Sequence, residues 1–349
     1  MNGLEDMKTS DYDYPLPDNL IAYIPPKVRG MSRLLALNKA TGELTDRSYG
    51  DIAEYLNPGD VLVLNDTKVI KARLKVTKQN GAVRELIILE KHGMVDDWHT
   101  HKVLYKRKLN EGDDLAIGSV RIHVDKIIGN GIAQVSCQED LLKLAEEYGS
   151  VPLPPYMHRE ATNSDTERYQ TVWANDEGSV AAPTASLNMT EEMLKTLQKK
   201  GVVVAFATLH VGLGTFMPIR ADDIANHVMH KEFFVLPKET IAAIRKAKND
   251  GKRVIALGTT ITRTLEYNAN IINSNDAPED LHGDADIFIY PGYTFKVIDS
   301  LVTNFHAPRS TVLMLTAAFA GWDELLPAYM HATAKEYSFL SYGDSMIIY

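Results

Sequence analysis

The stretch VVVAFATL at residues 202–209, followed by HVGLGTF at residues 210–216, indicates the class of fold. Eight consecutive residues, apolar except for one threonine, are typical of a strand buried on both faces. A predicted helix precedes this strand, with Thr190 as its N-cap and Gly201 just past its end. Another predicted helix begins at Pro237 and ends at Gly251. Helices that alternate with buried strands predict an α/β layer architecture.

The chain on either side of this stretch extends the pattern and then departs from it. Residues 253–257 and 287–290 are predicted to be further strands. Residues 61–148 instead contain short apolar runs separated by glycines, which predict a small antiparallel barrel or sandwich closed by a helix at 140–148. The runs lie at residues 61–64, 86–89, 103–105 and 120–124. We therefore expect an α/β main domain formed by both chain ends, residues 1–62 and 150–349, with a small antiparallel β-barrel domain, residues 63–149, inserted.

Composition limits the possible partners. The 349 residues are 45% hydrophobic and 24% charged, as in an average globular protein, and the formal net charge is -9. An acidic chain needs a local basic surface to bind nucleic acid. The predicted barrel contains such a stretch, which either contacts phosphates or is a solvated strand face. It comprises Lys68, Lys71, Arg73, Lys75, Lys78, Lys102, Lys106, Arg107 and Lys108, with Tyr105 among them.

The single cysteine, Cys137, excludes an internal disulfide and a multi-thiolate zinc site. No apolar stretch opens the chain, and the apolar run at 312–320 is shorter than the roughly 18 residues that a membrane span needs. We therefore expect a cytoplasmic protein, without a membrane partner and monomeric.

Three polar loops follow or adjoin the predicted strands, where α/β sheets usually place their sites. In the first, Gly212 and Gly214 either let the backbone approach a ligand or form a simple tight turn. In the second, Gly258-Thr259-Thr260 either holds an anionic group or caps a helix. The third, TNFHAPRS at 303–310, has the donors and acceptors to recognise a polar or aromatic substrate, and Ser310 also suits a helix cap.

His227, His230 and Glu232 suggest a metal site, because residues three apart share a helix face. A further ligand is not evident nearby, so we predict no metal. The sequence also lacks a Ser-His-Asp order, a Walker loop and a Gly-x-Gly-x-x-Gly motif. The residues alone therefore indicate an α/β enzyme and leave its substrate open.

Taken together, these segments resemble the family of S-adenosylmethionine:tRNA ribosyltransferase-isomerases, the queuosine biosynthesis enzymes. The resemblance extends over nearly the whole chain. The matching motifs are DYPLP at 13–17, SRLL at 32–35, PGD at 58–60, NDTKV at 65–69, ARL at 72–74, PLPPY at 152–156, ERYQTV at 167–172, GSVAAPTA at 178–185, TLHVG at 208–212, GTF at 214–216, HVMH at 227–230, GTT at 258–260, IFIYPGY at 287–293, TNFH at 303–306 and SYGD at 341–344.

The resemblance implies an α/β domain with an inserted barrel and a specific reaction. The ribosyl part of S-adenosylmethionine, a cosubstrate, is attached to the aminomethyl group of a 7-deazaguanine in the tRNA anticodon loop and rearranged to epoxyqueuosine. Adenine and methionine leave, and no metal is required. The candidate proton-transfer groups are His210, His227, His230 and His306. The candidate substrate-binding residues are Asn65, Asp66, Arg73, Thr184, Gly212, Gly214, Thr215, Thr259, Asn304, Arg309, Tyr342 and Asp344, the two arginines for phosphate or carboxylate.

The chain departs from the family pattern after Ala185. Members usually continue Gly-Leu-His-Phe-Thr, whereas this chain has Ser186-Leu187-Asn188-Met189-Thr190. Asparagine hydrogen-bonds but cannot transfer protons as histidine does. Two alternatives therefore stay open: a paralogue that acts on a different nucleoside, and a non-catalytic tRNA-binding relative.

Overall fold

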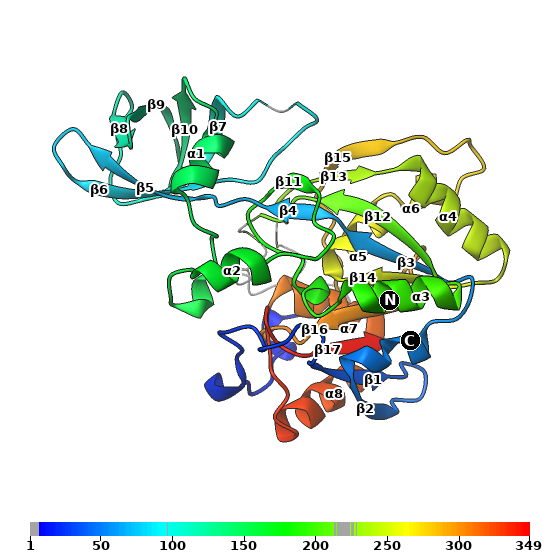
Figure 1. Ribbon diagram of the computed structural model, residues 1–349. Helices are drawn as coiled ribbons and strands as arrows, with labels where there is room; N and C mark the ends of the chain where they lie inside the picture. The colour runs from blue at the N-terminus through cyan, green and yellow to red at the C-terminus, as the bar shows by residue number, and fades with distance from the viewer. Residues whose placement is uncertain (1–6, 96, 213, 215–223, 225–226, 228) are drawn as a thin grey trace.

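The computed structural model describes residues 7–95, 97–212, 214, 224, 227 and 229–349. Within these residues the strands form a nine-stranded mixed sheet, a closed barrel and a two-stranded sheet. Figure 1 shows the barrel standing to one side of the body that contains the large sheet.

Four parallel strands form the centre of the large sheet. They are β12 (Val203–Leu209), β3 (Val61–Asn65), β14 (Val254–Leu257) and β16 (Ser300–Asn304), in that order. Beyond β12 lie the antiparallel strands β13 (Glu232–Leu236) and β15 (Leu281–Ala285). Beyond β16 lie β17 (Ser345–Ile348), β1 (Arg33–Leu37) and β2 (Leu44–Ser48). β17 joins the two parts of the sheet, because it runs antiparallel to β16 and parallel to β1.

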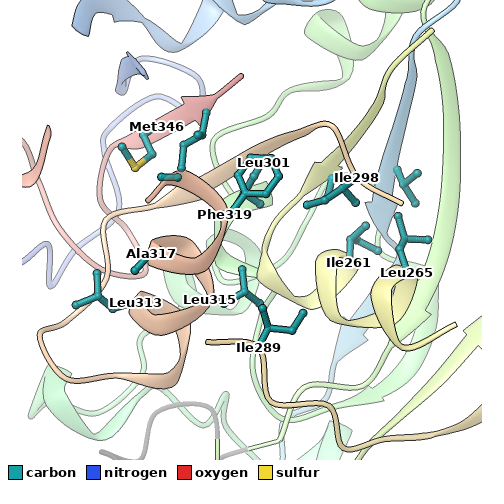
Figure 2. Packing of buried hydrophobic residues seen from close by; sticks show 14 of the residues in the cluster. Ile261, Leu265, Ile289, Ile298, Leu301, Leu313, Leu315, Ala317, Phe319 and Met346 are labelled. Atoms are coloured by element: carbon teal, nitrogen blue, oxygen red, sulfur yellow. The ribbon is translucent and has the colours of Figure 1, made fainter. Parts of the chain in front are cut away.

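The central strands of the sheet are buried on both faces, and their alternate residues belong to different cores. Val61 and Val63 of β3 belong to one hydrophobic cluster, and Leu62 and Leu64 belong to the other. The first cluster is covered by α4 (Lys238–Asn249), α5 (Thr259–Tyr267), α6 (Ala269–Ile272), α7 (Thr311–Ala320) and α8 (Trp322–Ala334). The second is covered by η3 (Tyr49–Tyr55) and α3 (Glu191–Lys200). Figure 2 shows side chains of α5 and α7 packed in the first cluster.

Six antiparallel strands form the barrel, in the order β10-β7-β6-β5-β8-β9. They are β5 (Arg73–Lys78), β6 (Val83–Ile88), β7 (Thr100–Lys106), β8 (Asp114–Ile117), β9 (Val120–Gly129) and β10 (Ile132–Cys137). Their inward side chains form a separate core, against which α1 (Leu141–Tyr148) packs. Asp140 caps this helix by accepting a hydrogen bond of 2.7 Å from the Leu142 amide.

The remaining elements connect the barrel to the sheet and frame the strand ends. β4 (Thr67–Val69) pairs with β11 (Asp176–Ser179) in parallel. The short helical turns are η1 (Thr9–Asp11), η2 (Asp18–Leu20), η4 (Pro155–Met157), α2 (Asn163–Arg168) and η5 (Thr184–Ser186). Among the described helices, none has both the length and the apolar character needed to cross a membrane.

The predicted fold class, an α/β domain with an inserted antiparallel barrel, is confirmed. Two details were wrong. Residues 61–64 were grouped with the barrel, but they form the buried strand β3 between β12 and β14. Residues 287–290 do not form a strand: their side chains pack against the core, while the carbonyl of Ile287 accepts a hydrogen bond from Arg263. The domain limits at residues 63 and 149 remain a proposal.

Candidate functional site

The carboxyl ends of the four parallel strands meet at one edge of the sheet. β3 ends at Asn65, β12 at Leu209, β14 at Leu257 and β16 at Asn304. The loops that follow these strands are therefore brought together, as expected for a site in an α/β sheet.

A cavity of about 170 Å³ lies at this edge. Its apolar wall includes Val211, Val312 and Leu340. Its polar lining residues are Tyr156, Thr184, Thr259, Thr260, Thr303, Asn304, His306, Ser310 and Ser341. No lysine, arginine, aspartate or glutamate is among the described residues that line it. An apolar wall with a few convergent polar groups is typical of a small-molecule site.

Asn304 is one of the residues that line this cavity, and its amide is buried. The residue is 2% exposed, and its Nδ2 donates to the carbonyl of Asp344 at 3.3 Å. Its Oδ1 accepts no hydrogen bond from any described residue. A buried acceptor without a partner costs free energy, which a ligand N–H group can recover.

His306 lines the same cavity and is held from both sides. Its Nε2 lies 2.8 Å from Thr303 Oγ1, its backbone amide donates to Tyr329 Oη at 3.0 Å, and its carbonyl accepts from Tyr14 Oη. Desolvation lowers the pKa of His306 to about 3. The ring is therefore neutral at pH 7, with one nitrogen that donates and one that accepts a hydrogen bond.

His210 precedes the lining residue Val211 and is not itself among the residues that line the cavity. It is 1% exposed, its Nδ1 is 2.8 Å from Thr67 Oγ1, and its Nε2 is 3.8 Å from Asp176 Oδ1. The ring stacks on Phe233, with centroids 6.2 Å apart. The hydroxyl, the carboxylate and the stacked ring together fix the imidazole in one orientation.

Two other predicted residues surround His210. Asn65 binds the backbone of Leu209 through both ends of its amide, at 3.0 and 3.1 Å, and so ties β3 to β12. The carboxylate of Asp66 accepts a hydrogen bond of 2.7 Å from Thr208 Oγ1. Burial, and then the charge of Asp176, raise the pKa of Asp66. Asp66 therefore keeps its proton to a higher pH than an ordinary aspartate does.

A fully buried carboxylate, Glu232, contacts Gly212 at the start of the glycine loop. It accepts hydrogen bonds from the guanidinium of Arg263 and from the Gly212 amide at 3.1 Å, and it lies 3.2 Å from His230 Nε2. Burial alone raises the pKa of Glu232, but the charge of Arg263 and the bonds from His230 and Gly212 outweigh it and hold the pKa at about 2. Glu232 is therefore ionised throughout the physiological range.

This lowered pKa makes stability depend on pH. The pKa of Glu232 is about 2 in the folded chain and 4.5 ordinarily, so its contribution is present above pH 4.5 and lost as the pH falls toward 2. We expect the difference in free energy of unfolding between the wild type and Glu232→Gln to shrink over this interval. Urea unfolding at several pH values measures it. A difference that stays constant down to pH 2 would contradict the assignment.

His227 and His230 lie beside the cavity, not in it. His227 packs edge-on against Phe288, and burial, followed by the charge of His230, lowers the pKa of His227. Phe288 lines a recess of about 20 Å³ that shares Thr259 and Thr260 with the cavity. Among the described residues, no three His, Cys, Asp or Glu side chains are grouped so that they could hold a metal ion.

The predicted site residues thus divide into three groups. Thr184, Thr259, Asn304 and His306 line the cavity. Asn65, Asp66, His210, Gly212, Gly214, His227 and His230 lie in the loops around it. The other described candidates have partners elsewhere: Arg73 with Glu85, Arg309 with Asp13, Tyr342 with Asp165, and Asp344 with the amide of Arg33. Thr215 lies outside the described residues.

Sequence reasoning missed Arg263, Tyr156 and Ser341 as individual members of the site. Arg263 sits in α5 between Ile261 and Leu265, where a charge is normally read as the solvent side of an amphipathic helix. Its partner, Glu232, lies 31 residues away, so no local pattern reveals the pair.

Most of the basic stretch is neutralised by nearby carboxylates. Lys68 pairs with Glu177, Lys71 with Glu146, Lys75 with Glu160, Lys78 with Asp113, and both Arg73 and Lys106 with Glu85, at 2.6 to 2.9 Å. Paired charges produce a weaker positive field than free ones. These contacts favour the solvated strand face, and phosphate contact by this stretch stays a prediction.

The residues that depart from the family pattern, 186–190, are not among those that line the cavity. Asn188 is 3% exposed, and its Oδ1 accepts a hydrogen bond of 2.7 Å from Ser32 Oγ. Its Nδ2 donates hydrogen bonds to the Gly343 carbonyl at 2.9 Å and to Ser345 Oγ at 3.1 Å. Its amide therefore binds the loop before β17 and does not line the cavity. Ser186 and Met189 are fully buried.

An α/β fold with an inserted β-barrel and a cavity at its strand ends suits an enzyme that acts on a small molecule. A family model described as queuosine biosynthesis protein matches residues 9–348. The chain belongs to this family.

Relatives that bear a name are similar to this chain over nearly its full length. A protein of Chlorobium phaeobacteroides named S-adenosylmethionine:tRNA ribosyltransferase-isomerase is 53% identical, covering 98% of this chain and 100% of the relative. One of the same name from Francisella tularensis subsp. mediasiatica is 45% identical with the same coverage. The crystal structure of S-adenosylmethionine tRNA ribosyltransferase from Thermotoga maritima is similar with a TM-score of 0.56 and 35% identity, covering 97% of this chain and 100% of that one.

Proposed function

We propose that this chain transfers and isomerises the ribosyl moiety of S-adenosylmethionine onto the 7-aminomethyl-7-deazaguanine of tRNA. Epoxyqueuosine is formed, and adenine and methionine are released. The observation that carries the proposal is the full-length similarity, at 45 to 53% identity, to relatives that bear the name of this activity. The tRNA anticodon loop is the proposed macromolecular substrate, and a cytoplasmic monomer is the proposed form.

The reaction needs two kinds of assistance that the strand-end residues can provide. The sulfonium of S-adenosylmethionine acidifies the adjoining C5′ hydrogens, and a base must remove one of them. Departing adenine must receive a hydrogen bond or a proton on a ring nitrogen. Asp66, with its raised pKa, and the buried His210 are candidates for the proton transfer.

His306 has a different proposed role. Because its pKa is lowered to about 3, the ring is not an imidazolium at neutral pH and cannot be a general acid in that form. As a neutral ring in the cavity wall it can donate or accept one hydrogen bond to the substrate. We therefore propose that His306 orients the substrate and does not carry the transferred proton.

The test is release of adenine from radiolabelled S-adenosylmethionine, with tRNA that carries the aminomethyl-deazaguanine and with tRNA that lacks it. We expect release only with the modified tRNA. Release with neither tRNA, from folded protein that still binds the modified tRNA, would reject the proposed reaction and favour a binding role. Release with an unrelated nucleoside substrate would instead indicate a paralogue.

A further inference from the structure

The cavity at the strand ends combines two properties that restrict its ligand. Its described lining contains no Lys, Arg, Asp or Glu, so it offers no counter-charge to a phosphate or a carboxylate. Its lining residues nevertheless carry hydroxyls and an imidazole, and they include Asn304, whose buried Oδ1 has no partner among the described residues. This combination suits a neutral, flat group with both hydrogen-bond donors and acceptors, and the group must include an N–H donor for Asn304.

We propose that this cavity binds the adenine base of S-adenosylmethionine, with Asn304 Oδ1 accepting a hydrogen bond from the exocyclic amine. The inference rests on the proposed function, which makes S-adenosylmethionine the cosubstrate. It adds to that function a place for the leaving base and a residue that distinguishes adenine from other purines.

The orientation of the Asn304 amide is what gives this contact its selectivity. The Nδ2 group donates to the carbonyl of Asp344 at 3.3 Å. Turning the amide over would bring Oδ1 against that carbonyl, so two acceptors would face each other in a buried place. The Oδ1 atom is therefore held on the other side of the amide from that carbonyl, where an amine would be attracted and a carbonyl repelled. Adenine carries an amine at this ring position, and hypoxanthine carries a carbonyl.

The charge of the cavity favours the base of S-adenosylmethionine over the base of the tRNA. A nucleotide within a tRNA carries phosphates on both sides, and proteins that bind them neutralise the charge with lysine or arginine. The nearest arginine in the third loop, Arg309, is bound to Asp13. Adenosine in S-adenosylmethionine carries no phosphate, so the uncharged cavity fits it without a counter-ion.

His306 completes the recognition. Its neutral ring stands in the cavity wall, with Nε2 bound to the Thr303 hydroxyl. Together with Thr259 and Thr260, it supplies groups that can donate to the ring nitrogens of adenine, while Asn304 accepts from the amine. A base held by both kinds of contact is positioned to leave with its ring nitrogen hydrogen-bonded.

Ligand-observed NMR titration with adenine and with hypoxanthine tests the proposal on the intact chain. We expect adenine to bind about 10- to 100-fold more tightly, the range for a buried acceptor that one ligand satisfies and the other does not. Equal binding of the two purines, or no adenine binding, would overturn the assignment. This comparison uses the wild type, so it does not depend on the folding of a variant.

Asn304→Ala then tests the residue, with Asn268→Ala as the matched control. Asn268 is also a buried asparagine, but its Nδ2 donates to the Thr264 carbonyl at the end of α5, and it does not line the cavity. We expect Asn304→Ala to bind both purines with equal affinity, and Asn268→Ala to keep the preference for adenine. A preference that survives in folded Asn304→Ala would overturn the role of Asn304.

The failure of this inference can be told apart from failure of the proposed function. Adenine release that depends on the modified tRNA, without discrimination between the purines, would reject the cavity assignment and leave the reaction standing. Selective adenine binding without release would support the cavity assignment and reject the reaction.

Discussion

Replacing Arg263 with methionine should lower the free energy of unfolding by about 3 to 5 kcal/mol, because it leaves the Glu232 carboxylate buried without its cation. Both side chains are enclosed: Arg263 is 5% exposed and Glu232 is fully buried. The guanidinium also donates to the carbonyls of Ala285 and Ile287, so these acceptors lose their partner as well. Urea unfolding at pH 7, followed by tryptophan fluorescence, measures the loss.

Two comparisons show whether burial causes this loss. The exposed pair of Lys246 and Asp250, 2.7 Å apart, provides the control, and Lys246→Met should cost less than about 1 kcal/mol. The double variant Arg263→Met with Glu232→Leu should recover part of the loss, because it removes both charges. If Arg263→Met cost no more than Lys246→Met, Glu232 would not depend on this cation.

Replacing Gly178 with alanine should reduce turnover about 100-fold, the loss that a displacement of about 1 Å can cause, because it moves the proposed proton-transfer group His210. Gly178 has φ +152°, and an added Cβ would lie 2.9 Å from the His210 ring and 2.8 Å from Lys91 Cβ. His210 cannot retreat, because Thr67 and Phe233 hold it on its other sides. The overpacking should also lower the free energy of unfolding by about 1 to 3 kcal/mol.

Gly81→Ala is the control variant that separates the effect of the contact with His210 from the effect of backbone strain. Gly81 also has a positive φ, +81°, but an added Cβ would meet nothing within 4 Å. It should therefore lose some stability through strain and keep wild-type turnover. Adenine release, measured where each variant is fully folded, makes the comparison. Wild-type turnover in Gly178→Ala would show that the position of His210 does not matter to the reaction.

Local signals made the fold predictable where they were strong. The apolar run at 202–209 predicted β12 within a residue, and the N-cap Thr190 predicted the start of α3. Both signals depend only on residues that are neighbours in the sequence. The edge strand β15, with the sequence LHGDA, gave no such signal. It pairs with β13, about 50 residues earlier in the chain, and the more apolar residues 287–290 were predicted to be a strand instead.

The candidate site was predictable to the extent that topology determines it. Parallel strands place the loops after them at one edge, and this brought Thr259, Asn304 and His306 to a single cavity. Composition could not show which polar side chains already had partners. Arg309 looked available in the sequence, yet it is bound to Asp13, nearly 300 residues earlier. The uncharged character of the cavity is likewise a property of the assembled fold alone.

The position of β17 between β16 and β1 has a consequence for how the chain is made. Leu34 of β1 pairs with Ser345 of β17, so the parallel partner of this apolar strand is synthesised about 310 residues after it. At the usual rate of synthesis this takes roughly 15 to 60 seconds. The barrel strands, which pair among themselves, can form during that interval, whereas β1 stays covered on one edge only, by β2. The nascent chain therefore has an open edge of β1 throughout this interval, through which it can aggregate and which a chaperone can cover.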